Sequence, residues 1–173
     1  MKNFEIYSSY YDLLNSKKNY LNEVNYIDKL IRSYDRRAKS ILDLGCGTAK
    51  HLNYLHKKKY KLHGVDISKH MIEIAKKRLK NKDICLTVSD VTKLKLNAKF
   101  DVVTSLFHVM SYQDTNNKVL NFFDSAYNHL NDNGIFIFDF WYGPGVLTDL
   151  PTVRIKRMEN SKLKCTRISV PSL

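Results

Sequence analysis

One stretch decides the fold of this chain: Ile41-Leu42-Asp43-Leu44-Gly45-Cys46-Gly47. Its apolar residues predict a β-strand with a carboxylate, Asp43, near the end, and its two glycines predict a turn. Thr48 follows at the expected N-cap of a helix. In such a unit the glycines let the backbone pass close to a ligand, and the helix N-terminus presents free N–H groups. We therefore expect a ligand at this turn.

The spacing of the motif narrows the choice of ligand. Lys50 stands where the dinucleotide fingerprint G-x-G-x-x-G requires its third glycine, and the phosphate loop G-x-x-x-x-G-K-[ST] is not matched either. Asp66 ends the next apolar run about 20 residues further on, where an acid can hydrogen-bond ribose hydroxyls. Asp43 would repel a pyrophosphate but suits a cation. A positively charged nucleoside without phosphates, such as S-adenosylmethionine, fits both carboxylates.

A series of motifs resembles, in the same order, those of the class I S-adenosylmethionine-dependent methyltransferases. The similar segments are 41–48 (motif I), 64–68 (motif II), 89–91 (the adenine-contacting motif), 100–105 (motif IV) and 131–138 (the turn and strand that follow). Together they cover roughly residues 38–140. The resemblance implies a Rossmann-like fold, S-adenosylmethionine as cofactor and S-adenosylhomocysteine as product.

Composition bounds the class of protein. A chain of 173 residues supports one domain with a real core. Its apolar runs are too short to span a membrane, and its N-terminus lacks the apolar region of a signal peptide. The three cysteines are scattered and form no C-x-x-C pair, which predicts neither a metal site nor a disulfide framework and favours the cytoplasm.

The net charge of +12 leaves two interpretations open. The lysines are spread along the chain, and their densest cluster, residues 57–61, ends a predicted helix, where cations complement the helix dipole. A solvated basic surface is the first interpretation. The alternative is a patch for a polyanion, either a nucleic acid or a substrate that carries phosphates.

Hydrophobic periodicity predicts alternating helices and strands. Helices are expected at residues 7–14, 21–34, 49–58, after an N-cap at Ser68, and at 116–130. Strands are expected at residues 40–44, 61–66, 84–89, 101–105 and 135–140. This alternation predicts an α/β fold, a doubly wound and mostly parallel sheet with helices on both faces. Ligands of such sheets bind at the carboxyl ends of strands, where Asp43, Asp66, Asp90 and Ser105 all fall.

Three regions are expected along the chain. Residues 1–37 would form an N-terminal helical lid, residues 38–142 the cofactor-binding core, and residues 143–173 a loop followed by the start of an antiparallel β element. We expect no helix after Phe140; Gly143-Pro144-Gly145 predicts the loop, and residues 153–159 and 163–170 predict a hairpin. Since the family closes its sheet with two further strands, we expect the sequence to be truncated.

The resemblance assigns roles to the strand ends. It implies that Asp43 lies at the methionine end of the cofactor, that Asp66 binds the ribose hydroxyls and that Asp90 accepts from the adenine amino group. The other expected cofactor contacts are Tyr11, Gly45, Cys46, Gly47, Ile67, Met71, Val91, Ser105 and Leu106. The acids could instead merely cap strand ends, so both interpretations stay open.

Aromatic residues outside this core are candidates for substrate contact. Tyr7 and Tyr11 share a helical face and are similar to the lid of sugar N,N-dimethyltransferases and of glycine N-methyltransferase; core packing is the alternative. Trp141 and Tyr142 resemble the aromatic segment that sugar N,N-dimethyltransferases place beside the substrate, without its proline and paired tryptophans. Aromatic faces stack on sugars, nucleobases and methylated ammonium groups alike, so the acceptor stays open.

His108 is the candidate catalytic base. It lies three residues past the fourth predicted strand, in a loop that faces the methyl group in the family. An imidazole changes charge near neutral pH and can take a proton from an amine or hydroxyl. A structural or exposed histidine is the plainer interpretation.

The sequence thus predicts a methyltransferase for a small molecule, with N- or O-methylation of a nucleotide-linked sugar as the first hypothesis. A nucleic-acid methyltransferase and a non-catalytic S-adenosylmethionine-binding protein are the alternatives. Against the former, Thr104-Ser105-Leu106-Phe107 differs from the Asp/Asn-Pro-Pro-aromatic motif that grips an exocyclic amine. No membrane partner is expected, and a homodimer is compatible with the sequence.

Overall fold

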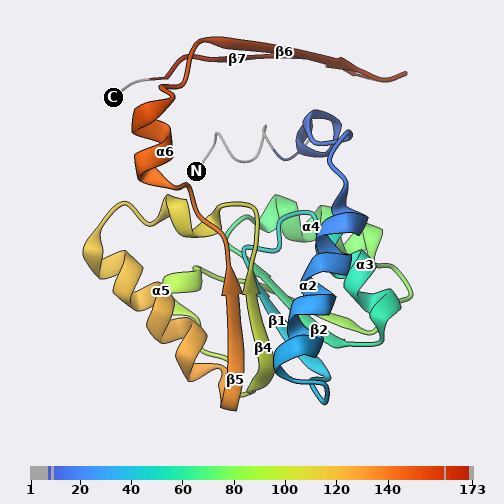
Figure 1. Cartoon of the computed structure of the whole chain (residues 1–173). Coiled ribbons are helices and arrows are strands. Elements are labelled where there is room, and N and C mark those ends of the chain that lie inside the picture. The colour runs from blue at the N-terminus through green and yellow to red at the C-terminus, as the bar shows by residue number, and fades with distance from the viewer. Residues whose placement is uncertain (1–7, 9, 162, 172–173) are drawn as a thin grey trace. The chain divides into compact units, whose positions relative to one another are not determined.

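The structure is a computed structural model that describes residues 8, 10–161 and 163–171 (Figure 1). It divides into two compact units, residues 19–140 and the residues before and after them. The first unit, called the core unit here, contains α2 (Tyr20–Tyr34), β1 (Ser40–Leu44), α3 (Lys50–Leu55), the 3-10 helix η1 (His56–Lys58), β2 (Lys61–Asp66), α4 (Lys69–Arg78), β3 (Ile84–Val88), η2 (Val91–Lys93), β4 (Phe100–Ser105), η3 (Val109–Tyr112), α5 (Asn116–Asn128) and β5 (Leu130–Phe138).

The sheet of the core unit has the predicted doubly wound topology. Its strand order is β3-β2-β1-β4-β5, and every neighbouring pair is parallel. The chain adds β2 and β3 on one side of β1 and then β4 and β5 on the other. The strand order therefore reverses between β1 and β4, and the carboxyl ends of these strands are the expected position for a ligand.

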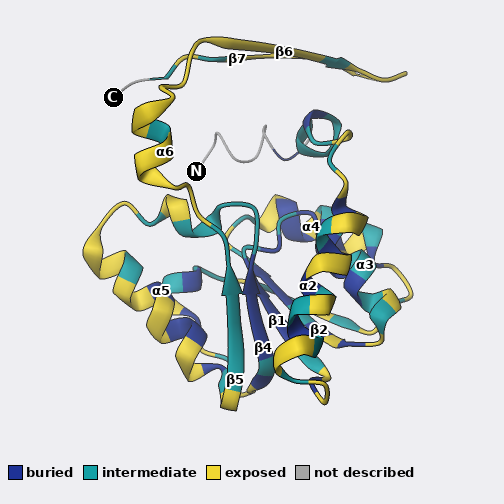
Figure 2. Cartoon of the chain, viewed as in Figure 1, coloured by how far each residue is buried: buried dark blue, intermediate teal, exposed yellow. Residues whose placement is uncertain are grey.

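Helices cover both faces of this sheet. Apolar residues of α2, α3 and α4 pack with Ile41 of β1, whereas α5 and η2 pack with Leu42 and Leu44 on the opposite face. Successive strand residues point to opposite faces, so β1 contributes to both hydrophobic clusters. Figure 2 shows β1 and β4 as buried strands, which explains why β1 carries apolar residues on both of its faces.

Helix α2 belongs to the core unit and packs on the sheet. Val24, Ile27 and Ile31 are buried in the same cluster as Ile41. The side chain of Asn19 caps the helix by accepting from the Asn22 N–H. Residues 20–34, which fall within the region 1–37 that we expected to form a lid, pack in the same compact unit as the sheet.

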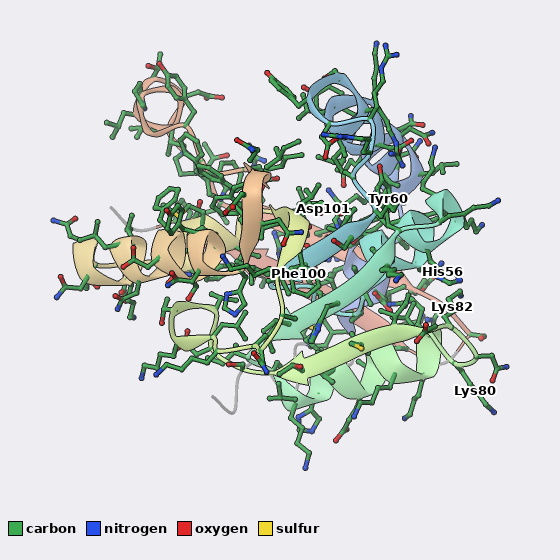
Figure 3. The ribbon with its side chains drawn as sticks, turned by 90° about the horizontal axis from the view of Figure 1, so that it is seen from below. His56, Tyr60, Lys80, Lys82, Phe100 and Asp101 are labelled. Carbon is green, nitrogen blue, oxygen red and sulfur yellow. The ribbon has the colours of Figure 1, made fainter. Side chains whose placement is uncertain are left out.

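The amino-terminal edge of the sheet is tied together by Asp101. Figure 3 looks at this edge from below, with Phe100 and Asp101 at the start of β4. Asp101 Oδ2 accepts from the Lys39 N–H at 2.8 Å and from the N–H and hydroxyl of Ser40 at 3.0 and 2.9 Å. Burial alone would raise the pKa of Asp101, but these bonds and one from Asn131 lower it below the ordinary value.

Some predicted boundaries are wrong. Ala49 in the left-handed region, φ 61°, and not Thr48, is the N-cap of α3, and the helix tightens into η1 after Leu55. Helix α5 ends at Asn128, so Leu130 begins β5 and pairs with Phe100. The pairing then shifts register before Ile135, and the predicted turn at 133–134 is an irregularity within β5.

The second unit holds the described residues 8, 10–18, 141–161 and 163–171. Residues 10–14 are helical, and α6 (Gly143–Thr148), β6 (Arg154–Glu159) and β7 (Lys164–Ser169) follow after β5. The hairpin of β6 and β7 is antiparallel, as predicted. Helix α6 contradicts the predicted loop: Pro144 lies in its first turn, where the missing N–H costs no hydrogen bond. The Lys156 ammonium donates to the Leu14 carbonyl and joins the hairpin to the N-terminal segment.

Candidate functional site

The predicted glycine turn is held against the end of β2. The N–H groups of Gly45 and Cys46 donate to the Val65 carbonyl at 2.8 and 2.9 Å. The Gly47 N–H donates to Asp66 Oδ2 at 2.8 Å. Gly45 and Gly47 have φ values of 79° and 54°, the left-handed region that glycine enters without strain. The turn therefore brings the ends of β1 and β2 into one site.

The two glycines have different surroundings. A Cβ added at Gly45 would lie 2.5 Å from Val109 Cγ2, so Val109 closes that side of the turn. A Cβ added at Gly47 would meet no atom within 4 Å. The open side of the turn is thus at Gly47, next to the carboxylate of Asp66, and a ligand can reach the backbone there.

Asp66 is oriented by two backbone donors. Besides the Gly47 bond, its Oδ1 accepts from the Ser68 N–H at 2.8 Å. Burial raises the pKa of Asp66, and the two hydrogen bonds counteract part of that rise. A carboxylate has about four acceptor positions, so capacity remains for the two hydroxyls of a ribose. Ile67 beside it is 57% exposed and offers an apolar surface.

Asp43 is the buried acid of the site, with an exposure of only 2%. Its Oδ1 accepts from the Thr104 hydroxyl at 2.8 Å. Burial raises the pKa of Asp43, the charge of His51 and the Thr104 bond oppose the rise, and the charges of Asp66 and Asp139 add to it. The charges of Asp66, at the end of β2, and of Asp139, just past β5, thus bear on the Asp43 carboxylate of β1, which makes this edge of the sheet attractive to a cation.

Asp90 follows β3 and caps η2. Its Oδ1 accepts from both the N–H and the hydroxyl of Thr92 at 2.8 Å. Capping was the alternative interpretation of this acid, and both bonds end on Oδ1, so Oδ2 can still accept from a ligand. The side chain of Val91 is buried in the core.

The loop after β4 is anchored by an acid that was not among the predicted site residues. Asp139 follows β5, and its Oδ2 and Oδ1 accept from the N–H groups of Phe107 and His108 at 3.0 and 2.6 Å. The imidazole Nδ1 of His108 lies 4.0 Å from Asp139 Oδ1.

The predicted residues at the end of β4 have structural contacts. Ser105 is fully buried, and its hydroxyl donates to the Leu44 carbonyl at 2.9 Å, which ties β4 to β1. Leu106 packs against the cluster under α2–α4.

The remaining predicted site residues differ in the burial of their side chains and in the unit to which they belong. Met71 is buried on the core face of α4, and the Cys46 side chain is buried, with its thiol pKa raised by burial. Tyr11, Trp141 and Tyr142 belong to the second unit, where Trp141 and Tyr142 are exposed. Tyr7 lies outside the described residues.

Three residues that shape the site were missed. Asp139 could have been found, since it is an acid at a strand end like Asp43 and Asp66. Thr104 and Val109 carry no sequence signal, because their roles arise from the pairing of β4 with β1 and from the path of the loop.

Within residues 8, 10–161 and 163–171 the structure shows neither a metal-binding cluster nor a membrane-spanning helix. No three His, Cys, Asp or Glu side chains gather there in a way that could hold a metal ion. No helix in this part of the chain combines the length and apolar composition needed to cross a membrane.

Comparison with known proteins gives a consistent result. The model of a family described as "Methyltransferase domain" matches residues 41–134, more than half of the chain. A dTDP-3-amino-3,4,6-trideoxy-alpha-D-glucopyranose N,N-dimethyltransferase of Streptomyces venezuelae is 31% identical over 145 residues, which is 84% of this chain and 60% of the relative. A dTDP-4-amino-2,3,4,6-tetradeoxy-D-glucose N,N-dimethyltransferase of Saccharopolyspora spinosa is 27% identical over 141 residues, or 80% of this chain and 56% of the relative.

Solved structures show the same fold. The crystal structure of Streptomyces venezuelae DesVI superposes with a TM-score of 0.83 at 28% identity, covering 96% of this chain and 71% of that one. An S-adenosylmethionine-dependent methyltransferase of Clostridium acetobutylicum superposes with a TM-score of 0.79 at 21% identity, covering 99% of this chain and 70% of that one. The chain spans about 60% of the length of the curated relatives that it matches.

Proposed function

Because this chain belongs to the methyltransferase domain family, we propose that it binds S-adenosylmethionine at the carboxyl ends of β1, β2 and β3 and methylates a small molecule. The acceptor that we propose is a nitrogen or oxygen of a sugar carried on a nucleotide. When bound, S-adenosylmethionine supplies a methyl group on a positively charged sulfonium, and S-adenosylhomocysteine is the product.

One observation carries the choice of cofactor: the Asp66 carboxylate accepts from the Gly47 N–H at the open side of the glycine turn, and the charges of Asp66 and Asp139 both act on the buried Asp43. Mutual repulsion of like charges is relieved by a cation. A dinucleotide would bring a pyrophosphate against these acids, whereas S-adenosylmethionine brings a sulfonium and an ammonium. The residues present therefore fit the cofactor.

The chain's own residues have separate tasks in this proposal. Asp66 receives the ribose hydroxyls, Asp90 receives the adenine amino group through Oδ2, and Ile67 packs against the base. Asp43 supports the methionine end. The methyl acceptor must then be held in line with the methyl group at near-contact distance, which can supply most of the catalysis. His108 is the proposed base for an acceptor that must lose a proton.

The sugar acceptor is supported by the named relatives, which are N,N-dimethyltransferases of nucleotide-linked amino sugars. The exposed rings of Trp141 and Tyr142 suit stacking on a sugar or a base. The three cysteines are free thiols, which supports our proposal that the protein is located in the cytoplasm. We also predict that the protein can form a homodimer, and analytical ultracentrifugation would measure its oligomeric state.

Calorimetric titration with S-adenosylmethionine tests the proposal. Wild type and Asp132→Asn, an exposed acid on the same sheet, are expected to bind saturably. Asp66→Ala should bind at least about 100-fold more weakly, because it removes the acceptor of the ribose hydroxyls. Circular dichroism and thermal unfolding would confirm that the variant is folded. A folded wild type that does not bind would refute the proposal for this chain.

A further inference from the structure

We propose that Asp139 is a positioning residue, whose carboxylate fixes the backbone of Phe107 and His108 and thereby the loop that closes the glycine turn. The inference deepens the proposed function, because it assigns a role in the same site to a residue that contacts the loop instead of the cofactor.

The position of Asp139 follows from strand pairing. Phe138, the last residue of β5, pairs with Ser105, the last residue of β4. The Asp139 N–H then donates to the Ser105 carbonyl at 3.3 Å. One residue past the sheet, the Asp139 carboxylate faces the loop that leaves β4. The end of β5 is thus in register to bind the residues that follow Ser105.

The carboxylate binds two successive N–H groups. Oδ2 accepts from Phe107 at 3.0 Å and Oδ1 accepts from His108 at 2.6 Å. Bonds to an ionised acceptor are stronger than bonds between neutral groups. A side-chain amide could not replace the carboxylate, because one of its two ends is a donor and would oppose an N–H.

The loop needs such an anchor. Phe107 and His108 have φ values of 69° and 64°, so two successive side-chain-bearing residues occupy the left-handed region. This conformation is strained for L-residues and persists only where surrounding contacts hold it. The side chain of Asp139 is 46% exposed, so its bonds to the loop, and not core packing, explain its presence.

Fixing these two residues sets the next part of the loop. His108 is the N-cap of η3, and Val109 is its first residue, the one that covers Gly45. The same carboxylate lies 4.0 Å from the His108 imidazole. Asp139 thereby sets both the closed side of the glycine turn and the backbone position of the proposed base.

Amide hydrogen exchange of the whole chain, followed by NMR, tests the inference. Asp139→Asn is expected to speed exchange at Phe107 and His108 by about tenfold or more, since each N–H loses a charged acceptor or meets an amide donor. Asp139→Glu, which keeps the carboxylate, should exchange more slowly than Asp139→Asn at both amides. Asp132→Asn should behave like wild type.

Three results would overturn the inference. Unchanged exchange at Phe107 and His108 in Asp139→Asn would show that the carboxylate does not hold the loop. Faster exchange that extends equally to Leu42 and Val103 in the central strands would make Asp139 a general stability residue. Exchange in Asp139→Glu as fast as in Asp139→Asn would show that the charge is irrelevant. Failure of the wild type to bind S-adenosylmethionine would instead refute the proposed function and leave this result standing.

Discussion

The Gly47 N–H donates a 2.8 Å hydrogen bond to Asp66 Oδ2, and this bond joins the two strand ends that hold the site. It orients the carboxylate before any ligand arrives, together with the Ser68 N–H on the other oxygen. Ordering a side chain in advance lowers the entropy lost on binding. The glycine turn therefore helps to hold the Asp66 carboxylate in a fixed orientation, and it also leaves room for the ligand to approach the backbone.

Replacing Gly47 by alanine should separate cofactor binding from stability. The φ of 54° is strained for alanine and should cost about 1–2 kcal/mol of unfolding free energy, while the added Cβ meets no protein atom. The same Cβ would fill the open side of the turn, and we expect weaker binding of S-adenosylmethionine. Urea unfolding and calorimetry measure the two effects. Wild-type affinity in Gly47→Ala would show that the cofactor does not approach this side.

Replacing Gly64 by alanine should give a purely structural defect. A Cβ there would lie 2.6 Å from Leu52 Cδ1, 2.8 Å from Cys46 Sγ and 2.9 Å from Leu86 Cδ2. Such overpacking in a closed core costs about 1–3 kcal/mol. Urea unfolding should measure this loss. The backbone adds no strain to it, because Gly64 lies outside the left-handed region. Unchanged stability would mean that the ends of the Leu52, Cys46 and Leu86 side chains can shift to make room for the added methyl group.

Much of the core unit could be predicted because its signals are local. Residues 40–44 and 61–66 are strands with the predicted bounds, since apolar runs between turn residues have few other solutions. Ser68 caps α4 as predicted, through its bond from the Met71 N–H. The acids at strand ends converge because a parallel sheet brings all carboxyl ends to one edge.

What could not be predicted depends on distant contacts. Asp139 acquires its role only when β5 pairs with β4, and Val109 only when the loop folds over Gly45. Helix α6 was missed because a six-residue segment with two glycines and a proline reads locally as a turn. The left-handed Ala49 carries no signal at all, because alanine rarely caps a helix.

Asp101 should stabilise the fold in a pH-dependent way. Its folded-state pKa lies below the ordinary value of 3.8, so its contribution is present above that value and is lost as pH falls through the folded pKa. Asp101→Asn should lower the unfolding free energy by on the order of 1 kcal/mol at pH 7, because exposure screens the interaction. The difference from wild type should shrink towards pH 3. A constant difference from pH 7 to pH 3 would contradict this assignment, and Asp132→Asn serves as control.

Asp43→Asn should lose function without losing stability. The pKa of Asp43 is raised by burial, so its stabilising contribution is complete below the ordinary value of 3.8 and is lost as pH rises through the folded pKa. At pH 7, above the ordinary value, this buried acid therefore weakens the fold relative to a neutral group. Asparagine keeps an oxygen for the Thr104 hydroxyl and removes the charge.

The variant is thus expected to unfold at equal or higher urea concentration than wild type at pH 7, with the advantage vanishing below about pH 4. Its affinity for S-adenosylmethionine should fall by about tenfold or more, because the cation loses a buried counter-charge. Urea unfolding at pH 7 and below pH 4 measures the stability, and calorimetry at pH 7 measures the affinity for S-adenosylmethionine. A variant that is less stable at pH 7 yet binds like wild type would show that Asp43 is a structural acid and not the counter-charge of the cofactor.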